Sequence, residues 1–181
     1  MPDKITMDKR RHLGYGEVNG MVKIGRKCGY DVYLDDSDSS SYVEVCVWLY
    51  DPQKIKKMRS AFDSRKVDRM KIAAHVNLSK RKKFWHVDLA EVDSQYRGKK
   101  LARKLYSFLI KKGFNLQAGD CQSVGGRYVW NELAKDRSIT VFARKSPYSK
   151  IIDFPRPGKK ELKSKSFDLF DSNAEIYAVA N

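Results

Sequence analysis

The sequence is poor in cysteine and has no long hydrophobic run. Its three cysteines, Cys28, Cys46 and Cys121, are an odd number without a C-x-x-C spacing. This pattern predicts neither a disulfide framework nor a zinc site, and it favours a reducing compartment. No stretch reaches the roughly 18 apolar residues of a membrane-spanning helix, and residues 1–11 lack the apolar centre of a secretory signal. We therefore expect a cytoplasmic protein with no membrane partner and no bound metal.

Acidic residues are scarce relative to basic ones. The 181 residues include 37 Lys and Arg but only 22 Asp and Glu, which gives a net charge of +15. Positions 53–112 contain nineteen Lys or Arg and five Asp or Glu, so +14 of the charge lies in one third of the chain. A field of this sign attracts polyanions and accelerates their encounter. Nucleic acid, an acidic protein and a phosphorylated cofactor all fit, and a merely solubilising surface is the alternative.

The hydrophobic pattern predicts a single α+β domain. A polar, basic arm spans residues 1–14, the domain spans 15–146, and an extension rich in Pro, Lys and Ser spans 147–181 and ends in a last strand. Alternating and helical spacings of apolar residues place the elements within the domain. We expect a hairpin over 16–34, strands over 42–50, 70–78, 84–92, 114–118 and 139–143, and helices that begin near 52, 98 and 123 and end near 62, 112 and 135.

The turn between the predicted strand 84–92 and the predicted helix 98–112 is a candidate phosphate site. A helix N-terminus has unpaired N–H groups and a partial positive charge, and Gly98 lets the backbone approach an anion closely. Arg97, Lys99, Lys100 and Arg103 place further positive charge around the same point. An ordinary glycine turn into a solvated basic helix is the alternative.

The same turn resembles the pyrophosphate-binding signature of the GNAT superfamily of N-acetyltransferases, Gln/Arg-x-x-Gly-x-Gly/Ala. Residues 95–100 (QYRGKK) match it except at the last position, and residues 97–102 (RGKKLA) match it except at the central Gly. Lys100 is the departure in both frames. Residues 123–133 (SVGGRYVWNEL) are similar to acetyltransferase-like proteins of bacteriophages.

The resemblance implies a mixed central sheet flanked by helices, with acetyl-CoA as co-substrate. It implies direct transfer of the acetyl group to an amine on a protein or small molecule, without a metal or a covalent intermediate. A bacteriophage origin implies action in the host cytoplasm on a host or phage macromolecule. The cofactor contacts that it assigns are Val92, Arg97, Gly98, Lys99, Lys100, Leu101, Ala102, Arg103 and Ser123.

The strand before the turn contains the candidate bases. His86 and Asp88 are two residues apart and therefore share one face of a strand, and their offsets match a catalytic pair of histidines in the arylalkylamine acetyltransferases. His86 would accept the proton of the amine, with Asp88 orienting it. The alternative is a buried pair in which His86 and Asp88 only satisfy each other's hydrogen bonds or those of the neighbouring backbone. Glu91 points to the opposite face unless a bulge reverses it, and it is a reserve base.

The expected general acid is absent. Many GNAT members carry a Tyr on the following helix that protonates the departing thiolate, and Trp130 stands at the matching position. An indole N–H donates hydrogen bonds but is not a useful acid. Tyr128 lies on another side of a regular helix. This departure favours a second hypothesis, an inactive or weakly active basic protein that binds nucleic acid or an acidic protein. Ser123 is also a natural N-cap for that helix.

Overall fold

The computed structural model describes residues 13–36, 45–60, 64–119, 123–144, 152–153 and 175–181. Most of the predicted arm 1–14 and of the extension 147–181 lies outside these ranges, as does Cys121. The described residues form ten strands, two α-helices and a short 3₁₀ helix. Neither α-helix has the length and apolar content needed to cross a bilayer.

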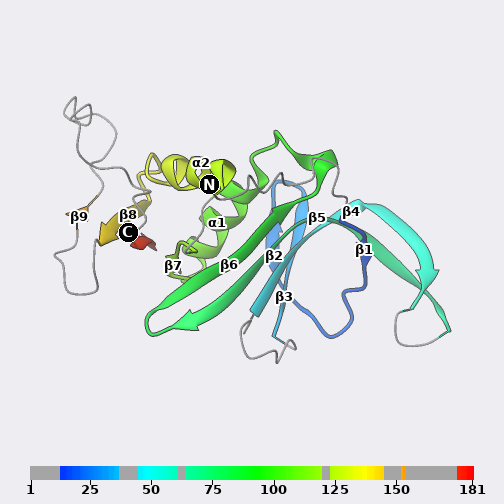
Figure 1. Ribbon diagram of the computed structural model, residues 1–181. Helices are drawn as coiled ribbons and strands as arrows, with labels where there is room; N and C mark the ends of the chain where they lie inside the picture. The colour runs from blue at the N-terminus through cyan, green and yellow to red at the C-terminus, as the bar shows by residue number, and fades with distance from the viewer. Residues whose placement is uncertain (1–12, 37–44, 61–63, 120–122, 145–151, 154–174) are drawn as a thin grey trace, which may run out of the picture.

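The first half of the chain builds an antiparallel sheet (Figure 1). Each strand pairs with the next one along the chain, and the short β1 adds to the outer part of β5. The predicted hairpin over 16–34 contains β2 and β3, which pair with each other. The strands are β1 (Tyr15–Gly16), β2 (Val22–Lys27), β3 (Tyr30–Asp35), β4 (Val45–Arg59), β5 (Lys66–Arg81) and β6 (Phe84–Val92).

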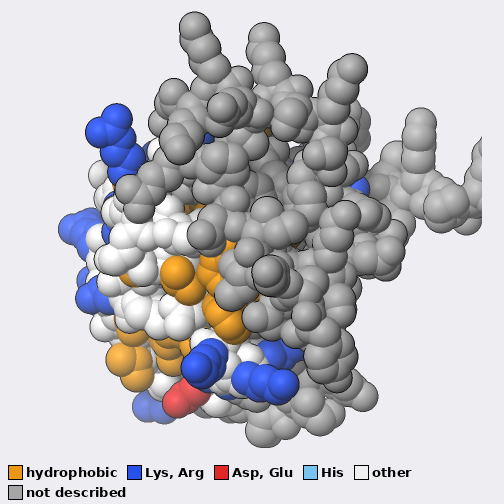
Figure 2. Space-filling model, turned by 90° about the vertical axis from the view of Figure 1, so that its left-hand side faces the viewer, with side chains coloured by type: hydrophobic (Ala, Val, Ile, Leu, Met, Phe, Trp, Pro, Cys, Tyr) orange, Lys and Arg blue, Asp and Glu red, His pale blue; other side chains and the backbone are white. Residues whose placement is uncertain are grey.

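The second half extends the same sheet and adds both helices. The elements are α1 (Leu101–Lys111), β7 (Leu116–Gln117), α2 (Val124–Leu133), β8 (Ile139–Arg144), β9 (Ile152–Asp153) and β10 (Glu175–Ala180). β7 runs parallel to β6, whereas β10 lies between β7 and β8 and is antiparallel to both. Figure 2 views the molecule from the left-hand side of Figure 1, and Lys and Arg side chains stand out from the described surface there.

The expected fold class, an α+β domain with a GNAT-like sheet flanked by helices, is wrong. The described chain is mostly sheet and has only two α-helices. The predicted helix from about 52 to 62 is instead the second half of β4 as far as Arg59. Its apolar residues Ile55 and Met58 have helical spacing, but they are 53% and 39% exposed and lie opposite Met70 and Val67 of β5. The core formed by the described residues does not extend to this point, so a helix would have nothing there to pack against, and Phe62, the last apolar residue of the predicted helix, lies outside the described residues.

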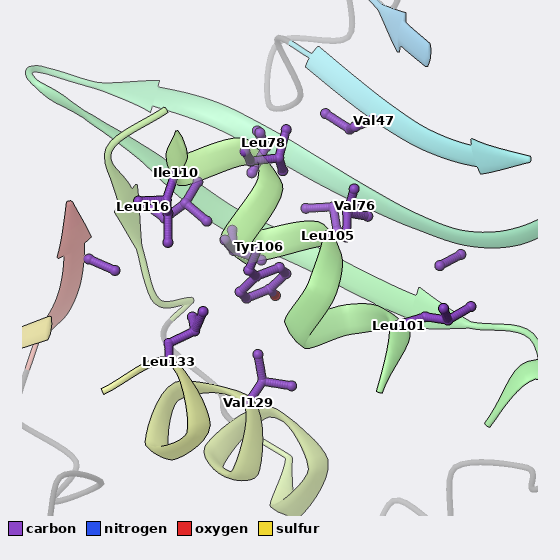
Figure 3. Close-up of a cluster of buried hydrophobic side chains, with 14 of the residues drawn as sticks. Val47, Val76, Leu78, Leu101, Leu105, Tyr106, Ile110, Leu116, Val129 and Leu133 are labelled. Atoms are coloured by element: carbon purple, nitrogen blue, oxygen red, sulfur yellow. The ribbon is translucent and has the colours of Figure 1, made fainter. Parts of the chain in front are cut away.

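The core lies between α1 and the sheet (Figure 3). The apolar stripe predicted for residues 98–112 forms the buried side of α1, where Leu101, Leu105 and Leu109 are almost fully inaccessible to solvent. Figure 3 shows Leu105 and its neighbours facing Val76 and Leu78 of β5. Gly113, with φ of +91°, follows the last turn of α1, as expected of a glycine that ends a helix.

Candidate functional site

The turn between β6 and α1 contains two left-handed residues. Gly98 has φ of +79° and Lys100 has φ of +57°. Lys100 is the N-cap of α1, and its side chain caps no backbone N–H group. The first N–H groups of α1 therefore remain available to an anion. The left-handed conformation falls on the two positions at which the GNAT signature has glycine.

Buried polar contacts anchor the segment before this turn. Asp93 accepts a hydrogen bond from the Gln95 backbone N–H at 2.9 Å and forms an ion pair with the Lys71 Nζ at 2.7 Å. The Tyr96 hydroxyl donates to Asp51 Oδ2 at 2.7 Å. Burial and then this hydrogen bond raise the pKa of Tyr96, so Tyr96 stays neutral and holds the turn against β4.

The predicted cofactor residues form a contiguous, mostly exposed basic turn. Arg97, Gly98, Lys99 and Lys100 are exposed, and Ala102 and Arg103 are half-buried. Arg103 reaches Glu132 of α2, with 3.5 Å between its Nη1 and Oε2 of the carboxylate. The Lys135 ammonium lowers the pKa of Glu132, and the charges of Arg103 and Lys100 lower it further.

Three other predicted cofactor residues have structural roles. The Leu101 side chain is 2% exposed and belongs to the core, so only its backbone can meet a ligand. Val92 also packs against the core. Ser123 is the N-cap of α2, as its alternative role predicted, and its Oγ accepts from the Gly126 N–H at 3.1 Å.

Among the described strands, β7 pairs with only a short part of the β6 edge that it borders. β7 pairs with β6 only where Leu116 and Gln117 lie beside Trp85 and His86. From Val87 to Val92, no described strand occupies this side of β6. The open backbone edge therefore ends next to the turn that leads into α1.

β6 contains a bulge that decides which side chains share a face. Val87 lies opposite Leu78, but Leu89 lies opposite Asn77, so Asp88 is the extra residue. After this bulge, Glu91 lies on the same face as His86. Regular alternation had placed Glu91 on the opposite face, and the bulge reverses this.

The structure brings His86 and Asp88 into contact. His86 Nδ1 is 2.8 Å from Asp88 Oδ1, and the same oxygen accepts from Ser79 Oγ at 3.1 Å. His86 is 3% exposed, whereas Asp88 is exposed. The carboxylate fixes the imidazole orientation and favours a proton on Nδ1. The contact with Asp88 therefore fixes one side of the His86 ring.

A second histidine on this face was missed by sequence reasoning. His75 of β5 lies opposite Glu91, with 3.6 Å between its Nε2 and Oε2 of the carboxylate, and its ring packs 4.8 Å from the Trp48 ring centroid. The signal in the sequence was a pair of polar residues, His75 and Asn77, two apart in the predicted strand 70–78, which is otherwise apolar except for Lys71. Their partners on β4 and β6 cannot be identified from spacing alone.

The residue at the expected general-acid position belongs to the core. Trp130 is 1% exposed and packs edge-on against Tyr106, with the ring centroids 5.8 Å apart. Tyr128 is 48% exposed. No group of three His, Cys, Asp or Glu side chains that could hold a metal ion occurs in the described ranges.

Comparison with models of known protein families, with curated proteins and with solved structures found no match.

Proposed function

We propose that this protein binds acetyl-CoA at the turn before α1 and transfers the acetyl group directly to an amine. One observation carries the proposal. Gly98 and Lys100 adopt the left-handed conformation at the two glycine positions of the GNAT signature, and they deliver an uncapped helix N-terminus to the end of the open β6 edge.

Each part of the cofactor has a matching group on the protein. The first N–H groups of α1, together with Arg97, Lys99 and Lys100, bind the phosphates. The pantetheine arm contains two amides, and it lies along the edge of β6 from Val92 towards Val87, beside which no described strand lies, as an added strand would. This path leads the thioester towards the point where β6 meets β7, which is the position of His86.

His86 is the proposed base. It removes a proton from the acceptor amine while Asp88 orients its ring, and the amine nitrogen then attacks the thioester carbonyl carbon. The new C–N bond forms, the C–S bond breaks and the thiolate of coenzyme A leaves. Glu91, on the same face and paired with His75, is the reserve base. Because Trp130 is buried in the core, water supplies the proton to the thiolate.

Trp130 also favours a second candidate function. A protein with the phosphate turn but with the buried Trp130 in place of the general-acid Tyr could bind acetyl-CoA and transfer nothing. It would then act as a basic binding protein for nucleic acid or an acidic protein.

Calorimetric titration with acetyl-CoA tests the binding step. Gly98→Asp places a carboxylate where the phosphates lie and should abolish binding. Gly29→Asp is the matched control, because Gly29 has φ of +87° and, like Gly98, nothing within 4 Å of an added Cβ. Both variants carry the same backbone strain and charge change. Equal affinities of the two variants would refute the cofactor site.

Acetyl transfer to amines tests the chemistry. His86→Ala and Asp88→Asn should each slow transfer by roughly 100-fold, the usual scale for a general base, without changing acetyl-CoA affinity. If Glu91→Gln alone stops transfer, Glu91 is the base and His86 is structural. If acetyl-CoA binds but no amine is acetylated, the second candidate function holds.

A further inference from the structure

The outer halves of β4 and β5 form a protruding two-stranded ribbon, which we name the β4–β5 arm (residues 53–59 and 66–70). In Figure 1 these paired ends project to the right, away from both helices. Residues 53–59 are all exposed, so this half of the arm supports no core. At about 3.4 Å per residue, its seven residues extend roughly 20 Å.

The arm is strongly basic. Positions 53–70 contain seven Lys or Arg and two Asp. Arg69 is neutralised by Glu17, with 2.7 Å between Nη2 and Oε1. Among the residues that the structure describes, Lys57, Arg59 and Lys66 form no ion pair. Their charges are therefore available to an external anion.

The cations lie on both faces of the ribbon. Lys57 and Arg59 share one face, because they are two residues apart, and Lys66 lies opposite Arg59 on β5. Lys56 lies on the other face, opposite Arg69. The acidic surface of a folded protein would meet one face of the arm. A nucleic-acid groove has phosphates along both of its walls, so it would contact the cations on both faces of the arm.

We infer that the β4–β5 arm inserts into the major groove of duplex DNA. That groove is about 12 Å wide and admits a two-stranded ribbon, whose strands are about 4.8 Å apart before side chains are added. The exposed Ile55, which shares a face with Lys57 and Arg59, would then face base edges, where apolar side chains contact thymine methyl groups. This inference is independent of acetyl-CoA binding.

The arm accounts for charge that the proposed cofactor does not need. Lys54, at the base of the arm, stacks over the Tyr96 ring with 4.9 Å between Nζ and the ring centroid, and Lys99 stacks over the same ring at 5.1 Å. The base of the arm therefore lies next to the turn before α1. The basic turn from Lys80 to Lys83, between β5 and β6, lies at the other end of these strands.

Fluorescence anisotropy with a labelled 20-base-pair DNA duplex tests the inference. Five phosphate contacts from Lys54, Lys56, Lys57, Arg59 and Lys66 predict a slope of log K against log salt of about −4.5. A triple variant, Lys57→Gln, Arg59→Gln and Lys66→Gln, should reduce the magnitude of the slope by about 2.7 and lower the affinity at 0.1 M salt by roughly 100-fold. These three side chains are exposed, and a thermal melt confirms folding.

The control removes the same charge at the opposite end of the strands. Lys80→Gln, Arg81→Gln and Lys83→Gln change exposed residues in the basic turn between β5 and β6. This variant should keep the wild-type slope to within about one phosphate contact. The single variant Arg59→Gln should reduce the slope by about 0.9, which provides a milder check if the triple variant melts early.

Duplex RNA of the same sequence separates groove insertion from plain charge attraction. Its major groove is too deep and narrow for side chains to read, so it should bind the protein more weakly than DNA. Equal binding of RNA and DNA would overturn the inference. No DNA binding by the wild type at 50 mM salt, or equal losses in the arm and control variants, would overturn it as well.

Discussion

Replacing Asp93 with Asn tests whether its ion pair with Lys71 holds the turn before α1 in place. The Lys71 side chain is 6% exposed and that of Asp93 is fully buried. Lys71 also donates to the Leu13 carbonyl. In Asp93→Asn the Lys71 ammonium would remain buried without its counter-charge, which typically costs about 3–5 kcal/mol. The new side-chain amide could still accept from the Gln95 N–H, so the loss reports mainly on the charge.

Urea unfolding followed by tryptophan fluorescence at pH 7 measures this cost. The double variant Lys71→Met, Asp93→Asn removes both charges and should recover about 1–3 kcal/mol of the loss, since directly interacting pairs are coupled on this scale. Lys80→Met, at an exposed position, should change stability by less than about 0.5 kcal/mol. A cost below about 1 kcal/mol for Asp93→Asn would refute the reasoning, because the pair would then contribute no more than a surface ion pair.

The pH dependence gives an independent check on the same pair. Burial raises the pKa of Asp93, but the hydrogen bonds from Lys71 and the Gln95 N–H, with the Lys71 charge, lower it by more, so the carboxyl titrates below its ordinary 3.8. Because the pKa is lower in the folded state than in the unfolded state, the ionised carboxylate stabilises the fold at any pH above the unfolded-state pKa. This contribution to the free energy of unfolding is lost as the pH falls through the folded-state pKa. The stability difference between wild type and Asp93→Asn should therefore be constant from pH 7 to about 5 and shrink below about 4.

Two further substitutions test backbone positions, one at a close contact and one in a left-handed conformation. In Gly25→Ala the new Cβ would lie 2.8 Å from Phe108 Cζ, so unfolding free energy should fall by about 1–3 kcal/mol. Gly14→Ala, with nothing within 4 Å, should change it little, and adding Phe108→Leu to Gly25→Ala should restore part of the loss. Lys100→Gly removes the steric cost of a side chain in the left-handed conformation. It should raise the free energy of unfolding, measured by thermal denaturation, by about 1 kcal/mol. A lower stability would show that Lys100 is not strained.

Local sequence signals predicted the elements that pack against the core. β6 matches its predicted range of 84–92, and α1 lies within 98–112 because it buries the apolar stripe that defined it. Ile55 and Met58 failed as a helix signal because spacing alone does not say whether a residue is buried. They lie in a strand that pairs with Val67 and Met70, and a local pattern of apolar residues does not reveal this pairing.

The contacts among the candidate site residues could be predicted in part for the same reason. His86 and Asp88 come together because two residues on one strand are constrained by local geometry. The bulge at Asp88 moved Glu91 to their face, and it is visible only in the pairing of β6 with β5. The contact of His75 with Glu91 depends on that same pairing, so no local pattern could have shown it.

The position of β10 constrains the order in which the sheet can assemble during synthesis. β10 fills the place between β7 and β8, yet the ribosome produces it after both. Until then, β7 has a free backbone edge, and β8 has no strand to link it to the rest of the sheet. An exposed edge of this kind is a site of intermolecular pairing. We therefore expect chains stalled before residue 175 to aggregate, although β2 to β6 and α1 are already complete.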